Sequence, residues 1–274
     1  MASVNTNVGA LVALQNLNAT SRSLETTQNR ISTGLKVASA KDNGGAFAIA
    51  QKLRGDVRSL DVVGESLSRV GSAVDVASAA GQAISDLLID LKEKALAATD
   101  TSLDSTSRTA LNEDFKALRD QIKTIVDNAS FNGTNLINNS TNSIAALANS
   151  DGSAAITVLD EALQLSGSIV TVTTTEAVDT VTNAKAALTA VKASLTNVNS
   201  SLARLGTKSK ALSIQSQFVS KLSDALTTSI GNLVDADLAK ESANLKALQV
   251  KQQLGVQALS IANQAPQTIL GFFR

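Results

Sequence analysis

Two closely spaced carboxylates, Asp235 and Asp237, are the side chains with the clearest potential for chemistry in this sequence. Paired carboxylates serve as general acid and base, or they supply oxygen ligands to a divalent metal ion. The glycine pair Gly44-Gly45 is a second candidate, because glycine-rich loops bind phosphate. Neither pair has the context that its chemistry needs. No cleft motif accompanies the aspartates, and no Gly-Lys-Ser or Gly-Lys-Thr follows the glycines.

These four residues are better interpreted as joints than as a chemical site. Asp235 and Asp237 interrupt a long apolar row and mark the junction between a helical bundle and a terminal helix. Gly44 and Gly45 form a flexible joint between the other terminal helix and the bundle, because glycine restricts the backbone least. All four are therefore hinge candidates.

The residue inventory argues against an enzyme. The 274 residues include no Cys and no His, which excludes thiol nucleophiles, disulfides, thiolate or imidazole metal ligands and a histidine base. Carboxylate-only chemistry remains open in principle. We expect no catalytic residue, no cofactor and no metal site. A chain without Cys also suits export that uses no disulfide-forming enzymes.

Charge and hydropathy argue against nucleic acid and membrane partners. Lys plus Arg and Asp plus Glu are each 24, and no aromatic-rich basic stretch occurs. No apolar run approaches the roughly 20 residues of a membrane helix. The start MASVNTNVGALVALQ has no positive segment, so we expect no cleavable signal peptide. The tail with Phe272 and Phe273 carries a single Arg and would anchor only weakly in a bilayer.

Seven-residue spacing predicts long helices in the first half of the chain, because a heptad repeat keeps one face buried. One helix of about 40 residues is predicted from two parallel rows. These are Leu60, Leu67, Val74, Gly81, Leu88, Ala95 and Val63, Val70, Ala77, Ile84, Leu91, Ala98. A second helix, with Asp104 or Ser105 as its cap, has the rows Leu111, Leu118, Ile125 and Phe115, Ile122, Ala129.

The second half repeats this pattern. One row is Val181, Leu188, Leu195, Leu202, and the other is Ala184, Val191, Val198, Leu205, Leu212, Val219, Leu226, Leu233. No proline interrupts either row. Such sustained periodicity indicates an elongated helical bundle.

The middle of the chain has turn and strand signals instead of heptads. Asn132-Gly133 favours a turn with positive φ. Residues 143–160 read as a short hairpin around Ser150-Asp151-Gly152, and residues 169–175 (IVTVTTT) are β-prone. We expect this stretch to be variable and to face outward. O-glycosylation of its Ser and Thr is an open hypothesis, which an unmodified intact mass would exclude.

Both ends are amphipathic but almost uncharged. Residues 2–21 carry no charged side chain, and residues 242–274 contain no acid. A solvated helix usually has Lys and Glu on its outer face, whereas a helix among copies of itself would have to desolvate them. We therefore interpret both ends as assembly segments buried by other copies. The polymer-contact candidates are Leu11, Leu14, Leu17, Leu24, Ile31, Leu35, Leu238, Leu245, Leu248, Leu259, Ile269, Leu270, Phe272 and Phe273.

The expected fold is mainly α: an elongated antiparallel coiled-coil bundle with a small β-hairpin region. The expected parts are an amino-terminal helix (1–42), the first half of the bundle (43–140), an outer hairpin segment (141–175), the second half of the bundle (176–234) and a carboxy-terminal helix (235–274).

Several blocks resemble the bacterial flagellins. They are SVNTN (3–7), RISTGLKVASAKDNGGAFAIAQKLR (30–54), FNGTNLI (131–137), LVDADLAKE (233–241) and LKALQVKQQLGVQALSIANQAPQTIL (245–270). The matches cover both ends in the family's order. Two places depart from the family. NGGAF (43–47) replaces the usual DAAGL, and LARLGTKSKA (202–211) lacks the family's arginines and its amide.

The resemblance implies a subunit of the flagellar filament, located outside the cell. Its paired ends would line the inner tube, the heptad helices would form the next shell, and the short middle segment would face outward. It also implies export through the flagellar type III system. The implied partners are copies of itself, with or without other flagellins, an export chaperone that binds residues 235–274, the filament cap and hook-associated proteins.

One stretch departs from the flagellin sequence that a Toll-like receptor senses. Many flagellins have QRVRELAV where this chain has IDLKEKAL (89–96). The altered positions lie around Asp90, Lys92, Glu93 and Lys94, and the charge changes oppose a complementary contact. The resemblance therefore implies weak or absent receptor activation.

Three other functions remain as alternatives at this stage. The hook–filament junction protein has similar ends but need not polymerise alone. A helical signalling module such as a chemoreceptor cytoplasmic domain would lack the matched end blocks. An enzyme is disfavoured by the residue inventory.

Overall fold

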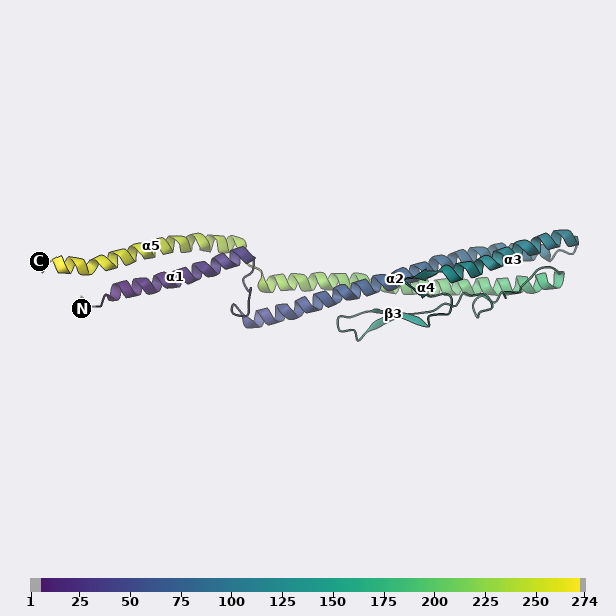
Figure 1. Ribbon diagram of the computed structural model, residues 1–274, viewed down its shortest axis with the longest axis horizontal. Coiled ribbons are helices and arrows are strands. Elements are labelled where there is room, and N and C mark those ends of the chain that lie inside the picture. Colours follow the sequence, from purple (N-terminus) through teal and green to yellow (C-terminus); the bar gives the residue numbers. More distant parts are fainter. Residues whose placement is uncertain (1–5, 272–274) are drawn as a thin grey trace. The chain divides into compact units, whose positions relative to one another are not determined.

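The computed structural model describes residues 6–271, and it describes side chains as far as residue 264. This part of the chain contains five helices and four short strands. They are α1 (Val8–Thr33), α2 (Gly44–Ala98), α3 (Ser105–Asn128), β1 (Ser130–Phe131), β2 (Thr134–Asn135), β3 (Ser143–Leu147), β4 (Ala155–Leu159), α4 (Val181–Val234) and α5 (Leu238–Gly271). The expected mainly α fold with a small hairpin is confirmed (Figure 1).

The chain divides into two compact units. The terminal unit consists of residues 1–55 and 225–274, and the bundle unit consists of residues 56–224. The division falls inside α2 and α4, not at the helix ends where the sequence suggested it. The reason is a small core formed by Val37, Ala50 and Val234, which joins the first turns of α2 and the last turns of α4 to the terminal unit.

In the bundle unit α2 packs antiparallel to α4. Both predicted rows of α2 are buried, from Leu60 to Ala98, which confirms its heptad pattern. Ser85 Oγ lies 3.3 Å from Asn199 Oδ1 across the pair. A Cβ on Gly81 would lie 2.9 Å from Leu202 Cδ2, so glycine allows the two helices to approach closely there.

One predicted row of α3 and one of α4 are displaced by one position from the prediction. On α4 the row starting at Ala184 is buried as far as Val219, but the Leu188 row is only half-buried. The positions one before it are buried instead: Ala187, Ser194 and Ser201. On α3 the buried row is Asn112, Arg119 and Val126, and Leu111, Leu118 and Ile125 are half-buried.

A non-helical segment, residues 161–180, explains this displacement. We call it the strap, because it lies against α3 and α4 and buries Leu163, Leu165, Val170, Val172 and Val178. The small buried residues of α4 leave room for it. The expectation of a strand at residues 169–175 is therefore wrong, since the backbone of this stretch bonds to side chains and to its own turn.

Polar contacts anchor the strap to α4. Ser194 Oγ accepts hydrogen bonds from the backbone N–H groups of Thr171 (2.9 Å) and Val172 (3.3 Å). At the start of the strap, Arg204 donates to both carboxylate oxygens of Glu161, with Nε 2.8 Å from Oε1. These contacts satisfy backbone and side-chain groups that the strap removes from water.

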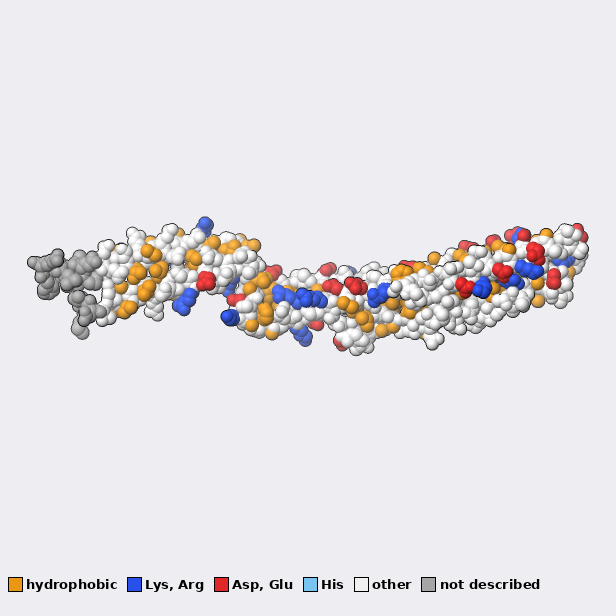
Figure 2. Space-filling model, in the orientation of Figure 1, with side chains coloured by type: hydrophobic (Ala, Val, Ile, Leu, Met, Phe, Trp, Pro, Cys, Tyr) orange, Lys and Arg blue, Asp and Glu red, His pale blue; other side chains and the backbone are white. Residues whose placement is uncertain are grey.

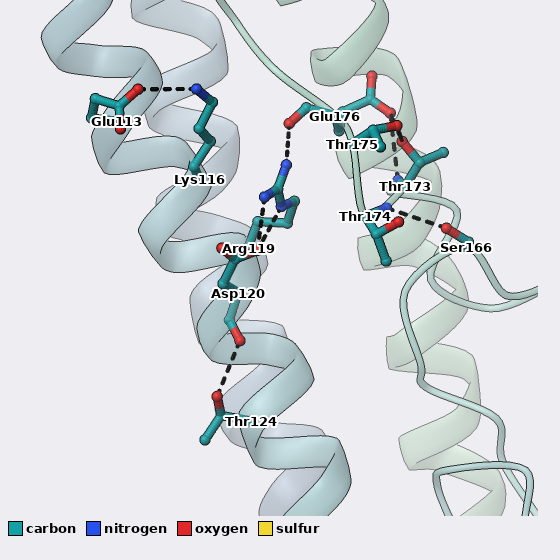
Figure 3. A network of polar contacts seen from close by, with 10 residues as sticks. All are labelled: Glu113, Lys116, Arg119, Asp120, Thr124, Ser166, Thr173, Thr174, Thr175 and Glu176. Carbon is teal, nitrogen blue, oxygen red and sulfur yellow. Dashed lines mark hydrogen bonds and ion pairs between the residues drawn. The ribbon is translucent and has the colours of Figure 1, made fainter.

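Further polar contacts anchor the strap to α3. Asn112 Oδ1 accepts from the Val178 N–H at 2.8 Å, and Arg119 Nη1 donates to the Glu176 carbonyl at 2.7 Å. Figure 3 shows Arg119 reaching from α3 to the strap, with Asp120 beside it. Both anchoring side chains of α3 are buried, although the heptad pattern predicted no role for them.

The two short sheets confirm the predicted turns. β1 and β2 pair through a turn in which Asn132 and Gly133 have φ of 49° and 78°. β3 and β4 form the predicted hairpin, with Ser143 opposite Leu159 and Leu147 opposite Ala155. Gln215 of α4 donates to the Ala148 carbonyl at 2.7 Å, so the hairpin is held against α4.

Candidate assembly interface

The terminal helices α1 and α5 pack against each other in antiparallel orientation (Figure 1). Asn7 caps α1 by accepting from the Ala10 N–H at 3.0 Å, and its Nδ2 donates to the Ala262 carbonyl at 2.7 Å. Further along, Leu17 packs on Gly255, where an added Cβ would lie 3.2 Å from Leu17 Cδ1. The predicted pairing of the two chain ends is confirmed.

An ion pair fixes the other end of this helix pair. Arg30 Nη1 lies 3.2 Å from Glu241 Oε1. The Glu241 side chain is only 11% exposed, whereas that of Arg30 is 38% exposed. A carboxylate in such surroundings needs its partner, because an uncompensated buried charge is costly. The pair therefore sets the register in which α1 and α5 meet.

Two connections, residues 34–43 and 235–237, pair with each other beside these helices. Gly34 ends α1 in the left-handed conformation, with φ of 73°. Its carbonyl accepts from the Ala236 N–H at 2.8 Å, and the Lys36 N–H donates to the Val234 carbonyl at 2.7 Å. The two halves of the chain are thus joined by backbone hydrogen bonds where they leave the terminal helices.

The four hinge candidates occupy capping and bridging positions at these connections. Gly44 and Gly45 are the first two residues of α2, and the Asn43 side chain accepts from the Ala46 N–H at 3.0 Å. Asp235 pairs with Leu35 in an isolated antiparallel bridge. The Asp237 side chain accepts from the Ala239 and Lys240 N–H groups at the start of α5. Their role as hinges stays a prediction.

A polar cavity of about 440 Å³ lies within the terminal unit at these connections. Its lining includes Arg30, Asp42, Asp235, Asp237 and Glu241. Hydrogen bonds from the Ser39 backbone and hydroxyl, with a further one from the backbone of Ala38, hold the pKa of Asp42 below its ordinary value. In the part of the chain that the structure describes, no group of three metal-ligating side chains is placed to hold a metal ion.

The polymer-contact candidates fall into three groups. Seven of them are half-buried: Leu17, Leu24, Ile31, Leu35, Leu245, Leu248 and Leu259. Three are exposed: Leu11, Leu14 and Leu238. The side chains of Ile269 and Leu270, and the residues Phe272 and Phe273, lie outside the described part of the chain.

Sequence reasoning missed the most exposed apolar side chains of the terminal pair. Val8 and Val12 of α1 are exposed next to Leu11, at helical steps of three and four. On α5, Val250, Leu254 and Ile261 are exposed at steps of four and seven, which places them on one face. Figure 2 shows hydrophobic side chains on the surface of this pair with few charges among them. These aliphatic residues lie outside the predicted rows, and their helical spacing is the signal in the sequence that indicates the exposed face.

The stretch that departs from the receptor-sensed sequence lies on α2. Asp90 and Glu93 are exposed, whereas Lys92 and Lys94 are half-buried. Lys94 Nζ lies 2.8 Å from Asp114 Oδ2 of α3, and this hydrogen bond raises the pKa of Lys94.

Comparison with known proteins decides the family. Residues 4–142 match the profile of the bacterial flagellin N-terminal helical region, and residues 188–273 match that of the C-terminal helical region. Flagellin FljK of Caulobacter vibrioides is 51% identical over 272 residues, covering 99% of this chain and 98% of that protein. The chain belongs to the bacterial flagellins.

A second relative agrees with this assignment. A flagellin of Brucella melitensis is 36% identical over 281 residues, covering 100% of both chains. Among solved structures, a Bacillus cereus flagellin shares 18% identity at a TM-score of 0.49, covering 55% of this chain and 86% of that one. No helix in the described residues is long and apolar enough to cross a membrane. As a flagellin, the chain is a structural subunit of the flagellar filament, and nothing favours the junction protein over this assignment.

Proposed function

We propose that this flagellin polymerises through the outer faces of α1 and α5. We call these the terminal faces: Val8, Leu11 and Val12 on α1, and Val250, Leu254 and Ile261 on α5. The observation that carries the proposal is that all six side chains are exposed in the isolated chain. A soluble protein rarely leaves apolar side chains gathered on one surface without a partner.

The energetics favour burial by other copies. Fully burying one large aliphatic side chain contributes about 1.5–3 kcal/mol, so several together give a substantial driving force. The sequence around them offers little opposition to burial, because residues 2–21 contain no charge and residues 242–274 contain no acid and only three basic side chains, Lys246, Lys251 and Arg274. Copies that pack side by side would therefore desolvate few charged groups.

The same exposure supports the finer predictions about partners. Before assembly, an apolar helix such as α5 needs protection, which fits an export chaperone that binds residues 235–274. The filament cap and the hook-associated proteins would meet the chain during folding and at the filament base. We further propose that the chain is an extracellular, non-enzymatic protein that leaves the cell through the type III channel.

Replacing three exposed residues of α5 tests the proposal. The variant Val250→Gln/Leu254→Gln/Ile261→Gln should keep its helical circular dichroism but lose polymerisation, because glutamine removes the apolar face and leaves the paired face intact. The matched control, Val250→Ile/Leu254→Met/Ile261→Val, should polymerise like the parent. Filament yield is measured by sedimentation and electron microscopy. Normal filaments from the glutamine variant would refute the proposal.

A further inference from the structure

The sequence contains two Asn-Gly pairs, Asn43-Gly44 and Asn132-Gly133. The side-chain amide of an asparagine is an electrophile that the backbone nitrogen of the next residue can attack, which closes a five-membered ring. A following glycine favours this reaction, because it has no Cβ to hinder the approach and its backbone is the least restricted. Both pairs are therefore candidate sites for loss of the asparagine amide, and the structure distinguishes between them.

The pair at residues 132–133 has both reacting groups in contact with water. Asn132 and Gly133 form the turn between β1 and β2, with φ of 49° and 78°, and both are exposed. The neighbouring residues Phe131 and Thr134 pair with each other and close the turn. In the part of the chain that the structure describes, no hydrogen bond holds the Asn132 side-chain amide or the Gly133 N–H.

The pair at residues 43–44 is held by the start of α2. Asn43 and Gly44 are also exposed, so exposure alone does not separate the two pairs. The Asn43 Oδ1 accepts from the Ala46 N–H at 3.0 Å, and the Asn43 carbonyl accepts from the Phe47 N–H at 2.9 Å. Gly44 is the first residue of the helix. Ring closure at Asn43 would require its side chain to leave the capping position, which costs the stability that the cap supplies.

We propose that Asn132 is a site of spontaneous deamidation in this flagellin, and that the helix cap protects Asn43 in the folded chain. The Gly133 nitrogen loses its proton to hydroxide and attacks Cγ of Asn132. A bond forms between this nitrogen and Cγ, the bond from Cγ to Nδ2 breaks, and Nδ2 takes a proton from water and leaves as ammonia. Water then opens the cyclic imide at either carbonyl, which gives aspartate or isoaspartate.

The two products differ in their effect on the backbone. Aspartate keeps the turn, because Asp-Gly favours the same hairpin geometry as Asn-Gly. Isoaspartate adds one carbon atom to the main chain and disturbs the pairing of Ser130 with Asn135. Asn135 is buried, its Nδ2 donates to the Val126 carbonyl at 2.7 Å, and its Oδ1 accepts from the Ile137 N–H at 2.9 Å. The isoaspartate form should therefore loosen the last turns of α3.

Both products also change the charge of the chain. Its 24 basic and 24 acidic side chains balance, so one new carboxylate gives every modified copy a net negative charge. A filament subunit stays in contact with water for as long as the filament lasts. Copies that were assembled earlier should therefore carry more of the acidic form than copies that were assembled later.

The reaction is followed by peptide mass spectrometry on the purified protein during several days in mildly alkaline buffer, which favours the deprotonated glycine nitrogen. In the folded protein Asn132 should lose its amide about fivefold faster than Asn43, because a helix cap of ordinary strength lowers the reactive population by about this factor. In concentrated urea both pairs lose their structure and should react at similar rates. Equal rates in the folded protein, or a faster reaction at Asn43, would overturn the proposal.

Two matched variants identify the residue in the intact protein. Asn132→Gln lengthens the side chain, so that closure needs a less favourable six-membered ring. Isoelectric focusing of the parent should show an acidic band that grows with time, and this variant should not form it. Asn43→Gln removes the other pair and should form the band as the parent does. An acidic band that grows equally fast in Asn132→Gln, or that disappears in Asn43→Gln, would contradict the assignment. Neither assay requires polymerisation, so its result is independent of the proposed function.

Discussion

Arg30 of α1 and Glu241 of α5 meet through a 3.2 Å ion pair, although 211 positions separate them in the chain. The contact joins the two ends of the flagellin near their connections to the rest of the chain. Its mostly buried carboxylate favours the register that places Arg30 beside Glu241.

Loss of this ion pair should loosen the terminal helices. Arg30→Ala leaves the Glu241 carboxylate without its partner and should lower the local stability of the α1–α5 pair by about 1–3 kcal/mol. Hydrogen exchange of the α5 amides is the measurement, and their protection should fall. Arg30→Lys retains the positive charge, so the α5 amides should lose less protection in this variant. Unchanged protection in Arg30→Ala would show that apolar packing alone sets the register.

A larger side chain at Gly81 should destabilise the bundle. A Cβ there would lie 2.9 Å from Leu202 and 3.5 Å from Leu163, so Gly81→Val should destabilise the bundle by about 1–3 kcal/mol through overpacking. Gly71 lies on the same helix with open space around it, so Gly71→Val is the matched control. Urea unfolding of both variants gives the comparison. Equal losses would mean that helix propensity, not the contact with α4, governs Gly81.

The Ser194 hydroxyl should stabilise the packing of the strap against α4. Its hydroxyl accepts from two backbone N–H groups of the strap, and Ser194→Ala would leave these groups without a partner. We expect a loss of about 1–3 kcal/mol in the free energy of unfolding and faster proteolysis of the strap. Ser200→Ala removes an exposed hydroxyl that bonds only within its own helix and should change little. A loss of the same size in both variants would contradict this role.

Asp160 should give the bundle an unusual pH dependence. Burial, with Glu161 adding to it, raises the pKa of Asp160 above 3.8, and its Oδ1 is buried without a partner in the described part of the chain. A raised pKa in the folded state means that the ionised form destabilises the fold. This penalty fades as the pH falls through the raised pKa and is absent below 3.8. Asp160→Asn should therefore raise the melting temperature at pH 7 but not at pH 3.

Asp151 provides the opposite control for that experiment. Hydrogen bonds from the Ser153 backbone and hydroxyl lower its pKa, so its ionised form stabilises the fold above 3.8 and the benefit is lost as the pH falls through the lowered pKa. Asp151→Asn should lower the melting temperature at pH 7. A shift of the same sign in both variants would show that the substitutions act through something other than these carboxylates.

Receptor activation should be weak, and two substitutions should raise it. The exposed Asp90 opposes the charge that the receptor-sensed sequence carries there, and Lys94 is tied to Asp114. A Toll-like receptor reporter assay should give little response to the parent and more to Asp90→Arg/Lys94→Leu. A strong response to the parent at low dose would contradict the prediction.

The sequence by itself determined the helices, the hairpin and the pairing of the chain ends. The α2 rows from Leu60 to Ala98 are aliphatic and strictly periodic, so they are buried whichever element covers them. Asn132-Gly133 specifies its turn locally, because few other residues adopt positive φ readily. The low charge of the two ends indicates segments that pack against other helices instead of facing water.

Only the tertiary structure decided which neighbouring row of α3 and α4 is buried. A heptad pattern indicates a face to within one position, and the aperiodic strap then selects Ser194 over Leu195 and Arg119 over Leu118. The exposed apolar face of α5 also depends on which elements meet. Contacts between segments far apart in the chain carry no local period, and this is the physical reason that they could not be read from the sequence.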